Sequence, residues 1–135
     1  MQQQGNSLQD QLFGSAGDVA VQRGLGEFRA GRPVLVQAAD ERLLVLPVDG
    51  APAERIAAFR TLCAPRLPRL AVTARRARVL GLETSGPVLL TVHSSDDADA
   101  IWTLAAGRRS QARPVAGPAG PAARAAIQLA KFAQR

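Results

Sequence analysis

The sequence has very few residues that could act as nucleophiles, bases or soft metal ligands. Cys63 is the only cysteine and His93 the only histidine among 135 residues. A single cysteine excludes an intrachain disulfide, and one Cys with one His cannot supply the three or four N/S ligands that zinc usually takes. We interpret Cys63 as a small buried apolar residue rather than a reactive thiol. His93 is interpreted as a structural or exposed residue, because no carboxylate or nucleophile partner for it can be named.

Long hydrophobic runs are also missing. No apolar stretch approaches the roughly 18 residues needed to span a bilayer. Residues 1–10 are polar and Gln-rich and lack the apolar segment of a secretory signal. Hydrophobic residues nevertheless make up 47% of the chain, which is enough to build a core. We therefore expect a soluble cytoplasmic protein with a flexible tail over residues 1–16 and one domain over residues 17–135.

Aromatic residues are scarce, whereas basic residues are abundant. Tyrosine is absent, the net charge is +6, and sixteen of the seventeen basic residues are arginine. This excess of Arg accompanies an excess of Ala, Gly and Pro, as GC-rich codons produce. No aromatic residues are interleaved with the two basic clusters, so the sequence does not predict a stacking platform for single-stranded nucleic acid. A basic nucleic-acid-binding domain remains an alternative. The clusters are Arg75, Arg76 and Arg78, and Arg108, Arg109 and Arg113.

Recognisable catalytic motifs are missing as well. Gly24-Leu25-Gly26 lacks the third glycine of a dinucleotide loop, where Arg29 stands, and no predicted strand precedes it. The sequence contains no Walker A motif and no nucleophile elbow. The acidic run Asp96, Asp97 and Asp99 is better explained as helix capping than as a cation site.

Apolar periodicity and turn residues predict strands that alternate with helices, which is typical of a small α/β or α+β domain. Thr73 is expected to cap one helix and Gly81 to end it, while Gly31 ends the first helix. Residues 107–120 are rich in Gly and Pro and are expected to form a loop or linker. The predicted helices begin near Asp18, Pro52, Ala74, the run Ser94-Ser95-Asp96-Asp97, and Pro121, and the predicted strands cover 33–36, 43–46, 70–72 and 88–92.

The most interesting polar cluster is Asp40-Glu41-Arg42, between the first two predicted strands. Ligand-binding and catalytic groups favour strand ends in α/β proteins. The simpler interpretation is a solvated turn of a β-hairpin. Sequence alone leaves both interpretations open.

Three segments, in this order, resemble dihydroxybutanone phosphate synthase, an enzyme of riboflavin biosynthesis. They are FRAGRPVLV (28–36), LAVTARRA followed by LGL (70–82) and AAIQLAKFA (125–133). The resemblance implies a reduced synthase-like fold, with a small mixed sheet flanked by helices. It also implies that the acidic loop, which holds magnesium and the sugar phosphate in that family, is shortened here to Asp40, Glu41 and Arg42. The family's Gly-His-Thr-Glu run, whose histidine is catalytic and binds the metal, is replaced by Pro121-Ala122-Ala123-Arg124, and its middle loop bearing Cys, His and Asp is missing.

A closer resemblance is to the N-terminal domain of some bacterial GTP cyclohydrolase II proteins, which looks like a decayed synthase. VTARRA (72–77) and RAAIQLAK (124–131) carry this resemblance. It implies a domain without catalytic residues that forms a homodimer and supports a cyclohydrolase module in cis or in trans. The zinc-binding cysteines of that module are absent, so we expect the N-terminal domain alone or a truncated product.

No cofactor of its own is expected for this chain. Magnesium belongs to the synthase and zinc to the cyclohydrolase, and their ligands are not found in the sequence. No membrane partner is expected either. One alternative keeps Asp40, Glu41 and Arg42 as the site of an active or ligand-binding sugar-phosphate enzyme of the riboflavin pathway, and the other is the nucleic-acid-binding domain described above.

Overall fold

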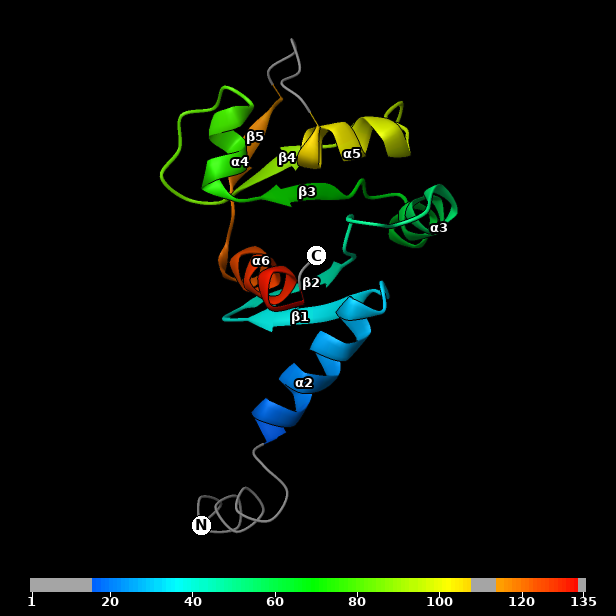
Figure 1. The fold of residues 1–135 in the computed structure, drawn as a ribbon, viewed down its shortest axis with the longest axis vertical. Coiled ribbons are helices and arrows are strands. Elements are labelled where there is room, and N and C mark those ends of the chain that lie inside the picture. The colour runs from blue at the N-terminus through cyan, green and yellow to red at the C-terminus, as the bar shows by residue number, and fades with distance from the viewer. Residues whose placement is uncertain (1–15, 108–113, 134–135) are drawn as a thin grey trace.

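The computed structural model describes residues 16–107 and 114–133, so the predicted tail, apart from Ala16, and the cluster at 108–113 lie outside the described residues. The predicted alternation of strands and helices is confirmed (Figure 1). In chain order the elements are α2 (Ala16–Arg29), β1 (Val34–Ala38), β2 (Glu41–Val45), α3 (Ala53–Cys63), β3 (Arg69–Val72), α4 (Ala74–Val79), β4 (Val88–Thr91), α5 (Ala98–Ala106), β5 (Ala116–Pro118) and α6 (Pro121–Ala133).

The strands form two separate antiparallel sheets rather than the single mixed sheet that we expected. β1 and β2 form a hairpin, and β3, β4 and β5 form a three-stranded sheet in that order. The connection between β3 and β4 contains the six-residue helix α4 and returns the chain antiparallel to β3, so the larger sheet has no parallel pair. The protein is therefore a mixed α/β fold in which helices flank two small antiparallel sheets.

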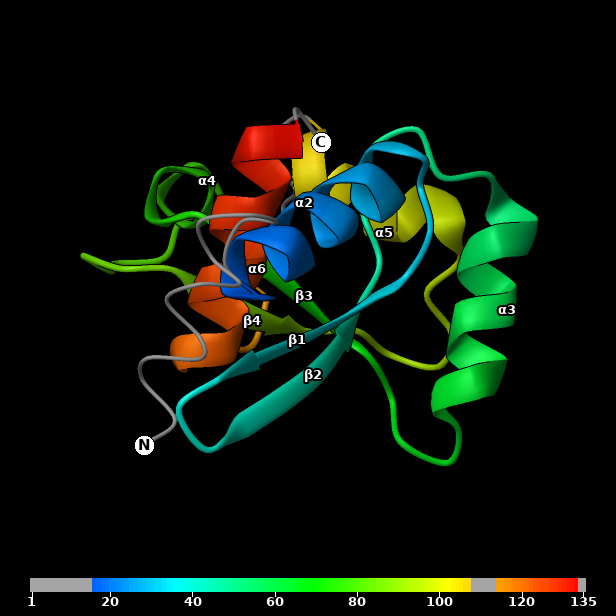
Figure 2. The ribbon, with the colours of Figure 1, turned by 90° about the horizontal axis from the view of Figure 1, so that it is seen from below.

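The two sheets lie in different layers (Figures 1 and 2). Helices α4 and α5 cover one side of the three-stranded sheet. Helix α6 lies on the other side, where it contacts β3 and also packs against β1 and β2. Helix α2 packs against α6 and β1, and α3 contacts α5. Among the described residues, no helix is both long and apolar enough to cross a membrane.

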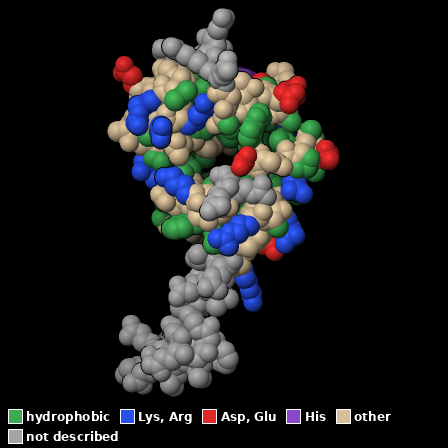
Figure 3. Space-filling view, viewed as in Figure 1, with side chains coloured by type: hydrophobic (Ala, Val, Ile, Leu, Met, Phe, Trp, Pro, Cys, Tyr) green, Lys and Arg blue, Asp and Glu red, His purple; other side chains and the backbone are tan. Residues whose placement is uncertain are grey.

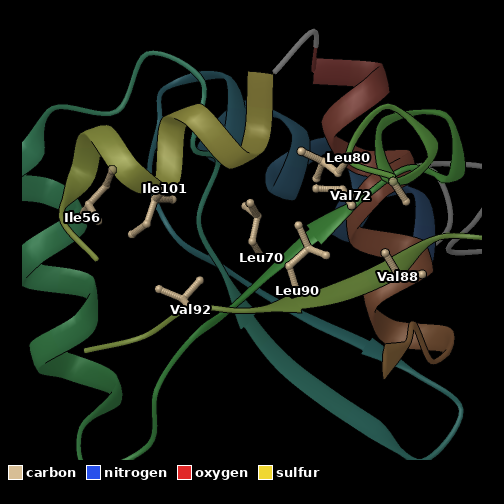
Figure 4. Packing of buried hydrophobic residues seen from close by; sticks show 9 residues of the cluster. Ile56, Leu70, Val72, Leu80, Val88, Leu90, Val92 and Ile101 are labelled. Atoms are coloured by element: carbon tan, nitrogen blue, oxygen red, sulfur yellow. The ribbon is translucent and has the colours of Figure 1, made fainter. Parts of the chain in front are cut away.

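The main core lies between the three-stranded sheet and its two covering helices (Figure 4). Alternate residues of a strand point to opposite faces, so Leu70 and Val72 of β3 are buried together while Arg69 is exposed. On β4, Leu90 is completely buried. Residues from α3, α4 and α5 complete this cluster, which comprises Ile56, Leu70, Val72, Ala77, Leu80, Val88, Leu90, Val92 and Ile101.

Most of the predicted helix ends are confirmed. The side chain of Thr73 accepts a hydrogen bond from the Arg76 N–H, as an N-cap should. Gly81 and Gly31 follow their helices with φ of 89° and 78°, a conformation that favours glycine. The expected cap at Asp18 is wrong, because α2 begins at Ala16. An acidic residue favours both the N-cap and the first turn of a helix, so composition did not separate the two positions.

Strand β5 was not predicted, since residues 116–118 fall in the segment expected to be a loop or linker. Its Ala-Gly-Pro sequence has low strand propensity. It pairs with β4 at the edge of the sheet, where proline is tolerated because one side of the strand needs no donors. The Thr91 N–H also donates to the Val115 carbonyl, at 2.9 Å.

Candidate functional site

The Asp40-Glu41-Arg42 cluster lies where the hairpin turns. Ala39 and Asp40 form the turn, and Ala39 has φ of 51°. Glu41 is the first residue of β2 and is half-buried, whereas Asp40 and Arg42 are exposed. The solvated-turn interpretation therefore describes Asp40 but not Glu41.

The three side chains do not converge on one site. Successive residues of a strand face opposite sides of the sheet, so Glu41 faces α6 while Arg42 lies on the outer face of the hairpin. Among the residues that the structure describes, neither Asp40 nor Arg42 has a side-chain hydrogen bond or ion pair. A substrate held jointly by all three side chains would need them on one side of the strand.

Glu41 caps helix α6. Its Oε1 atom accepts a hydrogen bond from the Ala122 N–H at 3.0 Å. Pro121 begins the helix and has no N–H, so Ala122 is the first residue of α6 that can donate. Gly120, which precedes Pro121, has no side chain with which to cap the helix. A carboxylate from the hairpin therefore fills the place that a neighbouring Ser or Asp usually takes, at the positive end of the helix dipole.

Gly120 leaves the space that this cap requires. A Cβ atom at position 120 would lie 2.5 Å from Glu41 Oε2, closer than non-bonded heavy atoms approach. Sequence reasoning did not single out Gly120 or Ala122 as partners of Glu41. The available signal was a Gly-Pro pair opening an apolar helix with no capping side chain nearby, which implies a partner from elsewhere in the chain.

Of the other acidic candidates, Asp97 caps a helix, as predicted, whereas Asp96 binds a backbone N–H of the preceding loop. Asp97 Oδ1 accepts a hydrogen bond from the Ala100 N–H at 2.8 Å, at the start of α5. Asp96 Oδ2 accepts one from the backbone N–H of His93, also at 2.8 Å. Asp99 lies in the first turn of α5, and the His93 side chain is exposed. Within residues 16–107 and 114–133, no group of three or more His, Cys, Asp or Glu residues could hold a metal ion.

Several arginines bind backbone carbonyl groups. Arg76 donates to the carbonyls of Thr103 and Leu104, at 2.8 and 2.9 Å, and so caps the C-terminal end of α5. Arg60 likewise links α3 to the loop before α5 through the carbonyls of His93 and Asp96. The same role is taken by Arg55 on Gly31, Arg78 on Thr84 and Arg124 on Ala119. These arginines stabilise the fold. Part of the positive charge of the chain therefore has a structural role and need not indicate nucleic-acid binding.

A basic groove of about 500 Å³ remains beside α6. Its lining includes Arg75, Arg124 and Lys131. The Arg124 side chain is already bonded to the Ala119 carbonyl at 3.0 Å. Arg75 is exposed and has no side-chain partner in the described part of the chain. Within the described residues, this groove is where Arg75 of the first basic cluster could contact nucleic acid.

Two further sequence interpretations can be compared with the structure. Gly24-Leu25-Gly26 lies inside α2 and so cannot form a phosphate-binding loop. Cys63 was expected to be buried, but it is half-buried at the end of α3 and lines an apolar cavity. The cavity is open enough to leave the thiol partly accessible.

No protein-family model, curated protein or solved structure matches this chain.

Proposed function

We propose that this chain is a non-catalytic structural domain of a cytoplasmic GTP cyclohydrolase II-type protein of riboflavin biosynthesis, resembling a decayed dihydroxybutanone phosphate synthase. The contact between Glu41 and Ala122 carries the proposal. By resemblance, Glu41 belongs to the remnant of the synthase's acidic loop, and Ala122 stands where the family has its catalytic histidine run. The two segments are in contact, but the contact is a structural hydrogen bond between the Glu41 carboxylate and the Ala122 backbone N–H.

This arrangement holds the fold together at the place where chemistry would be expected. A metal-dependent rearrangement of a sugar phosphate needs several carboxylates and a base that can exchange protons with the substrate. Here Glu41 is committed to the start of α6, Asp40 faces solvent, and alanine replaces the histidine. The nearest basic side chain on α6, Arg124, is bonded to the Ala119 carbonyl.

The second part of the proposal is homodimerisation through the outer face of the β1–β2 hairpin. Leu35 and Leu44 lie directly opposite each other on this face and are 61% and 39% exposed. A two-stranded sheet is marginal by itself, and covering this face would stabilise it. Asp40 and Arg42 flank the leucine pair with opposite, unpartnered charges. A two-fold axis would let each aspartate approach the other copy's arginine.

Sedimentation equilibrium tests the dimer. We expect the wild type to be dimeric at micromolar concentrations. Leu35→Glu and Leu44→Glu should be monomeric, because each variant places a charge on the hairpin face that the dimer would bury. Leu62→Glu is the matched control, since Leu62 is 65% exposed but lies on α3. A wild type that stays monomeric, or a Leu62→Glu variant that dissociates as readily, would contradict this interface. The cyclohydrolase module, in cis or in trans, is the second proposed partner.

Two simple measurements address the alternatives. A sugar-phosphate enzyme should be stabilised against heat by millimolar ribulose phosphate with magnesium, because a ligand of the native state raises stability. A nucleic-acid binder should be retained on DNA in a salt-sensitive manner that weakens in Arg75→Gln. We expect neither effect.

A further inference from the structure

A large apolar cavity separates the two layers of the fold. Its volume is about 700 Å³. It is bounded by β2 and the residues after it, by α3, β3, α5 and α6. Figure 3 shows the molecule hollowed between its upper and lower parts, with hydrophobic side chains along the margin. Pockets that bind small molecules usually measure roughly 300–1,000 Å³ and are mostly apolar, so this cavity is within the range of a ligand site.

The lining explains why the cavity stays open. Helix α6 presents Ala123, Ala126 and Ala130 to it beside one larger residue, Ile127, and the short alanine side chains do not reach across the space. Helix α3 contributes Ile56 and Phe59 to another part of the wall. An apolar cavity holds water poorly because its walls offer few hydrogen bonds. An apolar body that enters it gains contact with both layers.

The ionisable side chains that line the cavity are mostly positively charged. Four arginines and one carboxylate, that of Asp49, line the cavity. The guanidinium groups of Arg60 and Arg76 are bonded to backbone carbonyls. Arg66 and Arg69 are exposed, and neither side chain has a hydrogen bond or ion pair with another described residue. Two unpaired cations thus stand at the entrance to an apolar space.

We propose that this cavity binds an amphipathic carboxylate, a molecule with an extended apolar chain and one anionic head. The chain fills the space between the layers beside α6. The carboxylate lies at the rim and accepts hydrogen bonds from Arg66 and Arg69, because guanidinium groups match carboxylate geometry. The volume, the alanine wall and the unpaired arginines all favour this class of ligand over a neutral lipid or a sugar phosphate.

The sequence provides two natural probes of this cavity. Trp102 and Cys63 are the only tryptophan and the only cysteine, and both line it. Dodecanoate, kept below the concentration at which it forms micelles, is the test ligand, and dodecanol is its neutral counterpart. We expect dodecanoate to change Trp102 fluorescence saturably and to slow the reaction of Cys63 with a thiol reagent. Dodecanol should bind at least about tenfold more weakly, because it lacks the charge-assisted hydrogen bonds.

Variants separate the head site from the chain site. The exposed pair Arg66→Gln and Arg69→Gln, combined in one protein, should lower the affinity for dodecanoate to that for dodecanol. Arg75→Gln, an unpaired arginine outside the cavity, should change nothing. Ala130→Leu fills part of the wall and should weaken binding of both ligands.

Three results would overturn the proposal. The first is the absence of saturable binding. The second is equal affinity for dodecanoate and dodecanol, or an arginine double variant that binds dodecanoate like the wild type. The third is a Trp102 signal and Cys63 protection that rise with protein concentration without any ligand, since a second copy of the chain would then occupy the cavity. None of these results depends on the hairpin interface, which Leu35→Glu tests separately because Leu35, unlike Leu44, does not line the cavity.

Discussion

The carboxylate of Glu41 binds the backbone N–H of Ala122, joining residues 81 positions apart in the sequence. This one hydrogen bond ties the turn of the β1–β2 hairpin to the start of α6. It also uses the half-buried acidic side chain of the Asp40-Glu41-Arg42 cluster.

Removing the cap should destabilise the protein. Glu41→Ala leaves the first N–H of α6 unsatisfied, and we expect a loss of about 0.5–2 kcal/mol of unfolding free energy. Glu41→Gln retains an acceptor but loses the favourable charge at the helix end, so its effect should be smaller, about 0.3–1 kcal/mol. Asp40→Asn, one residue away in the exposed turn, is the control and should change stability by less than about 0.5 kcal/mol. Urea unfolding measures all three, and equal losses at positions 40 and 41 would contradict the capping role.

Gly120→Ala should act through Glu41. The new methyl group displaces the carboxylate from the helix end, so the cap is weakened as well. Gly117→Ala is the matched control, because a Cβ there meets nothing within 4 Å. In a double-mutant cycle, Gly120→Ala should cost less in the Glu41→Ala background than in the wild type, because the colliding group is gone. Identical costs in the two backgrounds would show that the two positions are independent.

The neighbouring arginines of α4 should behave differently. Arg76→Met removes two charge-assisted hydrogen bonds to the carbonyls that end α5, and we expect a loss of about 1.5–3 kcal/mol. Arg75→Met removes an exposed, unpaired side chain and should cost less than about 0.5 kcal/mol. Thermal unfolding of the two variants makes the comparison. If both variants lose the same stability, Arg76 does not have the structural role that its geometry indicates.

An exposed ion pair at the end of α2 should contribute a small pH dependence. The Arg32 guanidinium donates to the Glu27 carboxylate, which lowers the pKa of Glu27 and raises that of Arg32. Because the folded-state pKa of Glu27 lies below its unfolded value, its contribution is present above the usual carboxyl range near about 4 and is lost as the pH falls through the folded-state pKa. The pair is fully exposed, so the effect is small. Urea midpoints of wild type and Arg32→Gln should differ more at pH 7 than at pH 2, and a difference that grows on acidification would be the wrong sign.

A substitution in the turn of the β1–β2 hairpin should increase the stability of the protein. Ala39 has φ of 51°, in the left-handed region that disfavours residues with a Cβ. Ala39→Gly removes this strain and should raise stability by up to about 1 kcal/mol, despite the greater freedom of glycine in the unfolded chain. Ala38→Gly, in the regular strand β1, should instead lower stability. A destabilised Ala39→Gly would show that the turn carries no such strain.

The elements that sequence predicted well are defined by neighbouring residues. The helix capped by Thr73 and ended by Gly81 has both signals within a few positions, and Gly31 after α2 is similar. Strand β5 has no local signal, because Ala-Gly-Pro becomes a strand only when β4 offers it an edge. The division into two sheets also depends on long-range packing, which no local pattern specifies.

In the candidate site, too, sequence predicted the features that depend on neighbouring residues and missed those that depend on distant ones. Sequence identified Glu41 as a residue of interest and Asp97 as a helix cap, since capping requires only local spacing. It did not pair Glu41 with Gly120 and Ala122, because nothing within either segment points to the other. The cavity beside α6 was equally hidden, since an alanine on a helix indicates small volume but not what it faces.

The most direct test of the central claim is an assay of dihydroxybutanone phosphate formation from ribulose phosphate with magnesium, using the full chain. We expect no product above the protein-free control, because Glu41 caps α6 and, by the proposed resemblance, Ala122 stands where the synthase has its catalytic histidine. Turnover that is present in the wild type and disappears in Glu41→Gln, while the variant remains folded, would contradict it.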